Sequence, residues 1–194
     1  MKGDQMIKEN VLTIPANRRQ LKQHFDDAPE QVREYFSDLL GLLENFPLDV
    51  ALAYVFLRVE LAHNMALYCG VVKIHNASKE VAGAAIDANH VTRESFLEMF
   101  KTVFNLDLPT AICNLLENAE GVRDRVVHGR KILEHEKREA IMEVIQYAEK
   151  FNEIVYAAAK FRPFGNLKGF HGDGQSLSKA ATRWVLKGME FSLS

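Results

Sequence analysis

The sequence predicts an all-α protein, and three observations support this. Apolar residues recur at spacings of three and four through most of residues 29–161, which is typical of amphipathic helices. Proline, aspartate or threonine stands where several of these patterns begin, as at helix N-termini. Strand-like alternation is confined to the end of the chain. We therefore expect an up-and-down helical bundle of four to six helices, followed by a Gly-rich C-terminal extension with room for a short β-hairpin.

Composition narrows the class of protein. The 194 residues can build one sizeable core, and 47% hydrophobic with 26% charged residues is ordinary for a globular protein. The net charge of -2 gives no global sign of a nucleic-acid binder, so any RNA site must be local. Cys69 and Cys113 lie in apolar helical patterns and are interpreted as reduced core residues. Because no export signal or uninterrupted membrane span is evident, we expect a cytoplasmic protein without a membrane partner.

The chain divides into three predicted parts. Residues 1–28 form an N-terminal arm with a short helix around Arg18 to Phe25, residues 29–161 form the bundle, and residues 162–194 form the extension. Helices are expected at about 29–46, 49–70, 92–104, 109–129 and 133–160, with Thr92 as an N-cap. The alanine-rich stretch 77–89 fits either a thin helix or an ordered loop.

The C-terminal extension has two candidate roles. Its glycines at 165, 169, 172 and 174 break helices, and residues 183–193 alternate like a strand across Gly188. The extension is mildly basic, so it could contact an anionic ligand. Packing on the bundle or on a partner subunit is the favoured role, because Trp184 and Phe191 need burial.

The helix predicted at 109–129 carries the candidate chemistry. On a helical wheel its apolar residues share one face, and Arg123 lies in the middle of that face. An unpaired guanidinium there would be costly, so it is expected to meet a carboxylate or an anionic ligand. Conflicts of this kind between pattern and residue type are typical of functional sites.

His128 stands four residues after Asp124 and three after Arg125, spacings that bring side chains together on a helix. The Asp124 carboxylate can orient the imidazole, so proton transfer near neutral pH is available. Arg123 lies about 140° from His128 on a regular helix. Their convergence would need the reach of the arginine, a break near a glycine, or a second subunit.

In this helix an arginine is followed by a polar residue and, five positions after the arginine, by a histidine. The motif lies near the end of one bundle helix and before a long final helix, and it resembles the signature of HEPN domains. Arg123, Asp124 and His128 match the three motif positions, and Gly129 and Arg130 follow as is common in that family. The resemblance covers residues 30 to 160. Arg19 with His24, Arg58 with His63, and Arg130 with His135 share the spacing, but they lack this context.

The resemblance implies a function. Active HEPN proteins are metal-independent endoribonucleases that dimerise so that two motifs form one cleft. By this resemblance His128 would transfer protons, Arg123 would stabilise phosphoryl charge, and Asp124 would orient His128. A toxin or defence role, with a cognate antitoxin or regulatory protein, is the expected biological setting.

Further residues are predicted to support this site. Arg125, Arg130 and Lys131 are candidate RNA-backbone contacts, with a solvated helix end as an equally favoured interpretation. Arg58, Glu60, His63 and Asn64 are interpreted as a satisfied polar cluster from which Glu60 contacts Arg123 and His63 supports the site. For Arg123 and His128 the alternative to catalysis is a buried ion pair that fixes packing or a dimer interface.

Other chemistry finds little support in the sequence. The seven histidines are scattered, and the two cysteines are far apart, so neither a metal nor another cofactor is predicted. The competing hypothesis is a non-catalytic helical interaction or regulatory module that binds nucleotide, RNA or a protein partner.

Overall fold

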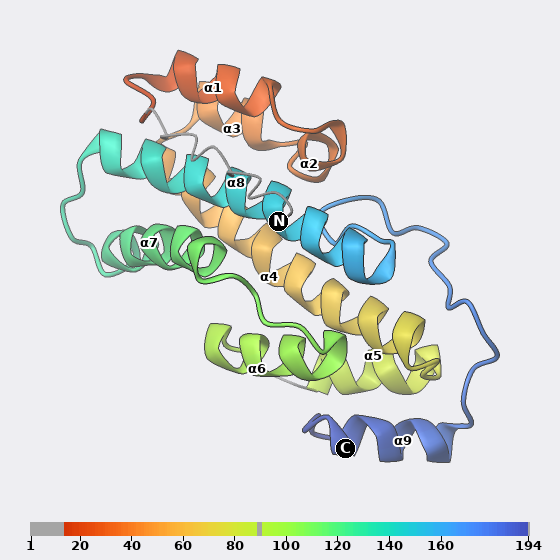
Figure 1. Cartoon of the computed structure of the whole chain (residues 1–194). Helices are drawn as coiled ribbons and strands as arrows, with labels where there is room; N and C mark the ends of the chain where they lie inside the picture. Colours follow the sequence, from red (N-terminus) through yellow and green to blue (C-terminus); the bar gives the residue numbers. More distant parts are fainter. Residues whose placement is uncertain (1–13, 89–90, 194) are drawn as a thin grey trace, which may run out of the picture.

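A computed structural model describes residues 14–88 and 91–193, and these residues form helices connected by turns and loops, without a strand. The all-α prediction is confirmed for this part of the chain (Figure 1). The helices are α1 (Arg18–Asp26), α2 (Glu30–Tyr35), α3 (Leu39–Asn45), α4 (Leu48–Ile74), α5 (Lys79–Ala88), α6 (Arg93–Phe104), α7 (Thr110–Val127), α8 (Glu134–Ala159) and α9 (Lys179–Gly188).

The three longest helices form the centre of the fold. α4 and α8 run side by side in the same direction, because Lys137 pairs with Asp49 near their starts and His63 meets Tyr147 further along. α7 runs antiparallel to α8, since Arg125 near the end of α7 bonds Glu136 at the start of α8, and Asn118, earlier on α7, bonds Glu143, later on α8. α1 and α3 lie on the opposite side of α8 from α7, and α9 is the outermost helix, beyond α5 (Figure 1).

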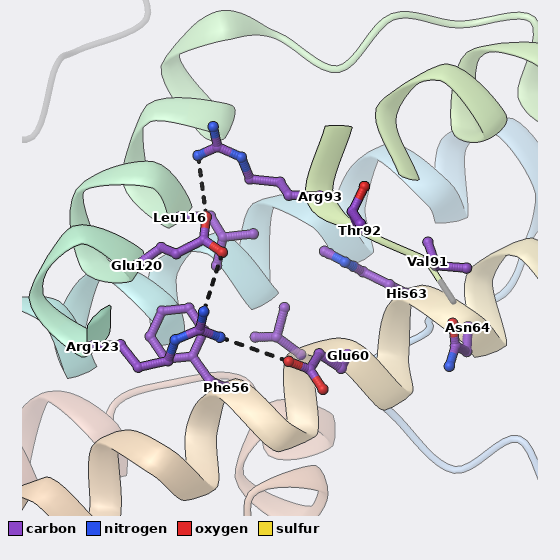
Figure 2. Close-up of a pocket in the computed structure, with 11 residues that line it drawn as sticks. Phe56, Glu60, His63, Asn64, Val91, Thr92, Arg93, Leu116, Glu120 and Arg123 are labelled. Atoms are coloured by element: carbon purple, nitrogen blue, oxygen red, sulfur yellow. Dashed lines mark hydrogen bonds and ion pairs between the residues drawn. The ribbon is translucent and has the colours of Figure 1, made fainter. Parts of the chain in front are cut away.

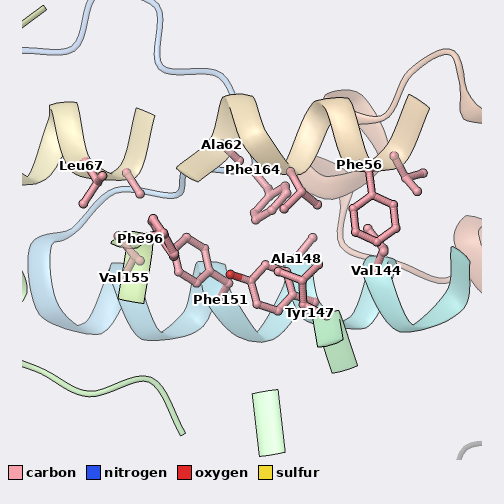
Figure 3. Packing of buried hydrophobic residues seen from close by; sticks show 14 of the residues in the cluster. Phe56, Ala62, Leu67, Phe96, Val144, Tyr147, Ala148, Phe151, Val155 and Phe164 are labelled. Carbon is pink, nitrogen blue, oxygen red and sulfur yellow. The ribbon is translucent and has the colours of Figure 1, made fainter. Parts of the chain in front are cut away.

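An aromatic cluster fills the space between α4, α6 and α8. The rings of Phe96, Tyr147, Phe151 and Phe164 lie in mutual contact, with centroids 5.5–6.1 Å apart in the pairs that touch. Phe56 and Leu67 of α4 face residues of α8 at the two ends of the same layer (Figure 3). Burial of large rings dominates the energetics of such a core, so this layer fixes how α4 and α8 lie against each other.

Several predicted helices are present where the pattern placed them. The N-terminal helix is α1, capped by Asn17, whose Oδ1 accepts a hydrogen bond from the Gln20 amide at 3.0 Å. Thr92 caps α6 as predicted, because its Oγ1 accepts a hydrogen bond from the Ser95 amide at 3.2 Å. The stretch 77–89 was expected to be either a thin helix or an ordered loop, and residues 79–88 form a helix, α5.

The helix predicted at 29–46 is divided into α2 and α3. The break leaves the carbonyl of Tyr35 free, and Nη2 of Arg58 donates a hydrogen bond of 2.5 Å to it. The Tyr35 hydroxyl donates in turn to the Arg58 carbonyl at 2.9 Å, and the guanidinium lies 4.0 Å from the Tyr35 ring centroid. Arg58 therefore holds α2 against α4, but its buried Nε has no hydrogen-bond partner among the described residues, so the prediction that it is a fully satisfied polar residue is wrong.

The C-terminal extension contains a helix where a β-hairpin was predicted, and that prediction is wrong. Ser178 caps α9, and Thr182 and Leu186, four residues apart, form its buried face. The alternation that resembled a strand also fits this helical spacing. Phe191 is buried as expected, but Trp184 is 80% exposed, so the expectation that it packs on the bundle is also wrong.

By length and composition, α4 could cross a membrane, and it is the only such helix among the described residues. Half of its most apolar stretch is buried inside the fold. A core helix of a soluble protein has the same composition, and α4 occupies that position here.

Candidate functional site

A charged cleft lies between α4, α6 and α7. Its volume is about 310 Å³, and the side chains that line it include Phe56, Glu60, His63, Asn64, Arg93, Glu120 and Arg123. Three of these, Glu60, His63 and Arg123, were predicted site residues. The antiparallel packing of α7 on α4 brings Arg123 over Phe56 and Glu60 (Figure 2).

Arg123 is held by carboxylates of its own subunit. Its guanidinium donates to Oδ1 of Asp124 from Nε at 3.0 Å and from Nη2 at 2.8 Å. Glu120 lies 3.5 Å from Nη2, and Glu60 lies 3.7 Å from Nη1. The guanidinium carbon is also 4.8 Å from the centroid of the Phe56 ring. The predicted contact between Glu60 and Arg123 is therefore present, and the arginine on the apolar face is neutralised.

The same network extends to α6 through Arg93. Its guanidinium lies 3.4 Å from Glu120 (Figure 2). It also lies 3.4 Å from Glu117. The whole network contains four carboxylates, with Asp124 included, and two guanidinium groups, an excess of two negative charges. Glu117 and Asp124 do not line the cleft, where Glu60 and Glu120 balance Arg93 and Arg123, so the negative excess lies outside the lining.

These ion pairs are weak enough to rearrange. The Arg123 side chain is 25% exposed, and its partners Glu60 and Asp124 are more than half exposed. Exposed pairs of this kind stabilise a protein by about 0–1 kcal/mol each. A bound anion that makes a bidentate contact could therefore displace a carboxylate from Arg123 at modest cost.

Asp124 and His128 do not make the predicted contact. The Asp124 carboxylate is bonded to Arg123, and His128 has no side-chain hydrogen bond or ion pair among the described residues. α7 ends at Val127 because Gly129 follows with a φ of 68°, a conformation that suits glycine. His128 is thus the C-cap of α7, and its side chain is exposed to solvent.

The predicted RNA-backbone residues divide into two groups. Arg125 is occupied, because its guanidinium donates to Glu136 at 3.0 Å and to the Gly121 carbonyl at 3.2 Å. Arg130 and Lys131 are exposed on the loop after His128, and neither side chain has an ion-pair partner within the described part of the chain. The loop at the end of α7 is therefore a small cationic surface that also carries the motif histidine.

His63 is a buried neutral histidine. Its ring stacks on Phe96 with centroids 3.7 Å apart, and its Nε2 shares a hydrogen bond of 2.6 Å with the Tyr147 hydroxyl. Burial lowers the pKa of His63 to about 3. It supports the wall of the cleft, but it is poorly suited to carry a proton at neutral pH. Arg58, Glu60 and His63 therefore have separate partners and do not form one cluster.

An exposed apolar stripe on α4 borders the cleft. The stripe consists of Val50, Ala53, Leu57 and Leu61, of which Leu57 is 55% exposed. Val127, at the end of α7, is 71% exposed. The stripe residues recur at spacings of three and four, as on a helix that packs against another helix. This surface is a candidate interface next to Arg123.

The sequence did not identify the roles of Glu120 and Arg93. Glu120 precedes Arg123 by three residues, a spacing that predicts contact on a helix, so a signal was present. Arg93 reaches the cleft from α6, and no local pattern predicts which helix faces α7. Among the described residues, no group of three or more His, Cys, Asp or Glu side chains is placed to hold a metal ion.

Comparisons of the chain with protein-family models, with curated proteins and with solved structures find no match. The likeness to HEPN domains therefore rests on the motif residues and the helical order alone.

Proposed function

We propose that this chain is a HEPN-like cytoplasmic protein that dimerises and cuts RNA without a metal ion. The observation that carries the proposal is the free imidazole of His128, exposed at the end of α7 beside the unpaired cations Arg130 and Lys131. An accessible histidine next to cations is what phosphodiester cleavage by proton transfer requires.

In the proposed reaction, one His128 takes the proton of a ribose 2′-hydroxyl, and the oxygen attacks the adjacent phosphorus. The bond between phosphorus and the 5′-oxygen breaks, and a second His128 in the dimer returns a proton to that oxygen. The products are a 2′,3′-cyclic phosphate and a 5′-hydroxyl. Arg123 would leave a carboxylate to stabilise the phosphoryl oxygens.

The α4 stripe supports the homodimer. Exposed Leu57 and Leu61 share one face of α4 next to Glu60, whose carboxylate meets Arg123. A second copy packed on this stripe would cover its apolar surface and bring two motifs together. The proposal also includes the fold, an up-and-down bundle of the HEPN type, and an antitoxin or regulatory protein as a second partner.

The test is cleavage of mixed RNA in chelator by the wild type, by His128→Ala and by the control His135→Ala. His135 is another exposed histidine, on the first turn of α8. We expect the wild type and the control to cut RNA and His128→Ala to lose activity by at least about a hundredfold. Equal activity of all three proteins would remove His128 from the mechanism.

The dimer is tested separately. Leu57→Glu should convert a dimer into a monomer in sedimentation experiments, because it places a charge in the stripe. Leu106→Glu is the control, since Leu106 is a partly exposed leucine on the loop after α6. A wild type that sediments as a monomer at micromolar concentration would contradict the dimer.

The second candidate function is a non-catalytic interaction module. One observation favours it: the carboxylates of Glu60, Glu120 and Asp124 already surround Arg123, so an incoming phosphate must compete with them, whereas a cationic segment of a protein partner need not. Absence of RNA cleavage by the dimeric wild type would favour this function over the ribonuclease.

A further inference from the structure

A second cavity lies where α8 ends, on the part of the chain that follows the bundle. Its volume is about 400 Å³. We call it the basic loop pocket, and its defining side chains are Lys73, Lys160, Arg162, Lys168, Phe161 and Phe170. Four of these are cations, whereas no aspartate or glutamate lines the pocket.

Three of the four cations of the pocket have no carboxylate partner among the described residues. Lys73 pairs with Asp173. Arg162 stacks its guanidinium 3.8 Å from the centroid of the Tyr156 ring and has no carboxylate partner among the described residues. The Lys168 side chain has no hydrogen-bond or ion-pair partner there, and Nζ of Lys160 donates to the Ala157 carbonyl at 3.4 Å and lies 5.5 Å from the centroid of the Tyr156 ring. Like charges gathered without counter-charges repel one another, so an anion would relieve the repulsion.

The loop that carries these cations is held in place at both ends. At its start, the buried side chain of Asn152 donates to the Phe164 carbonyl at 2.8 Å and accepts from the Phe164 amide at 2.9 Å. At its end, Lys79 donates to the Phe170 carbonyl at 2.6 Å. Gly172 packs so closely on α4 that an added Cβ would lie 2.8 Å from the Val72 carbonyl oxygen. A pinned loop loses little entropy on binding a ligand, so the cations are pre-organised.

We propose that the basic loop pocket binds a small phosphorylated ligand of the nucleotide class. The phosphates would meet Lys160, Arg162 and Lys168, and the base would lie against Phe170, which is partly exposed and contacts Phe161 edge to face at 5.3 Å. The cavity volume lies within the range of small-molecule sites, roughly 300–1,000 Å³.

This site is independent of the proposed ribonuclease. Lys73 follows Glu60 by thirteen residues on α4, and at 1.5 Å per residue the two lie roughly 20 Å apart along the helix. The two proposals can therefore fail separately.

The test is isothermal titration of the full chain with ATP, AMP and inorganic pyrophosphate, for the wild type, Lys168→Gln and Lys187→Gln. Lys187 is an exposed lysine of α9 without an ion-pair partner among the described residues, so it matches Lys168 in charge and exposure. We expect ATP to bind with a Kd below about 1 mM, and Lys168→Gln to weaken it about tenfold. Lys187→Gln should bind like the wild type. Because Lys168 is exposed on a loop, its substitution should leave the helical circular dichroism unchanged.

Three outcomes would overturn the proposal. They are no binding of any of the three probes at about 10 mM, equal weakening by Lys168→Gln and Lys187→Gln, and ATP binding that Lys168→Gln leaves unchanged. Pyrophosphate binding as tightly as ATP would overturn the role of Phe170. Amide shifts of Gly165 and Gly169 in the nitrogen-15 spectrum on addition of ATP would support the location, and shifts confined to other segments would contradict it.

Discussion

Oδ1 of Asp124 accepts two hydrogen bonds from the guanidinium of Arg123, at 3.0 Å from Nε and 2.8 Å from Nη2. The two residues are neighbours in sequence, so this pairing needs no partner from another helix. It occupies the carboxylate that the helical spacing assigned to His128. Asp124 therefore positions the arginine of the motif and leaves the histidine free.

The first prediction concerns this positioning. Asp124→Ala should slow RNA cleavage by about tenfold, because Arg123 would lose its aligned partner. The melting temperature should change little, since an exposed ion pair contributes about 0–1 kcal/mol. Asp107→Ala is the control, as Asp107 is another exposed aspartate paired with a cation, Lys101. Cleavage by Asp124→Ala at the wild-type rate, with RNA binding also unchanged, would contradict the positioning role.

The second prediction concerns pH and His63. Burial lowers the pKa of His63 to about 3, whereas the unfolded chain has a histidine pKa near 6.5. Between these values the unfolded state binds a proton that the folded state does not. The free energy of unfolding should therefore fall as the pH drops below about 6.5, by at most about 1.4 kcal/mol per pH unit from this residue.

Urea unfolding of the wild type and of His63→Gln at several pH values measures this dependence. The variant should lose stability at every pH, because Tyr147 loses its partner in the core. Between about pH 4 and 6, the free energy of unfolding of the variant should change less with pH than that of the wild type. Parallel curves would show that His63 is not neutral in the folded protein.

Helix positions could be predicted from the sequence, because the core needs apolar residues at helical spacing. α6 and α8 lie within the predicted ranges 92–104 and 133–160, and they bury Phe96 and Phe151. The break between α2 and α3 could not be predicted in this way. It depends on the hydrogen bonds between Arg58 and Tyr35, which lie on different helices. The same limit applies to Arg93, which joins the cleft through tertiary packing.

The C-terminal extension was mispredicted for another reason. Alternation over a few residues fits both a strand and one face of a short helix, and Ser178 as an N-cap decides for the helix. Burial of Trp184 was predicted from residue type alone, but Thr182 and Leu186 occupy the face of α9 that packs inward. The contact between Glu60 and Arg123 was predicted correctly because an arginine on an apolar helix face needs a carboxylate.

The third prediction uses Trp184 as a probe. It is the single tryptophan of the chain and is 80% exposed, so its fluorescence should resemble that of indole in water and be quenched fully by iodide. Trp184→Ala should change the free energy of unfolding by less than about 0.5 kcal/mol, because it removes little buried surface. Blue-shifted emission that moves on dilution would show instead that a second copy covers α9.

The fourth prediction concerns Asn152, which joins the end of the bundle to the basic loop pocket. Its buried amide makes two hydrogen bonds to the backbone of Phe164, so Asn152→Ala leaves a buried amide and a buried carbonyl without partners. Each unmet group costs about 1–3 kcal/mol, and we expect a loss of about 2–4 kcal/mol in the free energy of unfolding, measured in urea.

The matched control is Asn166→Ala, because Asn166 accepts a single exposed hydrogen bond from the Lys168 amide at 2.9 Å on the same loop. It should change stability by less than about 0.5 kcal/mol. Asn152→Asp keeps the acceptor but places a buried carboxylate oxygen against the Phe164 carbonyl, so it should also be less stable than the wild type at neutral pH. Since Asn152 also orders the loop, Asn152→Ala should weaken ATP binding at a temperature where the variant is still folded. Unchanged stability of Asn152→Ala would mean that water replaces the amide and that the loop is held from its other end alone.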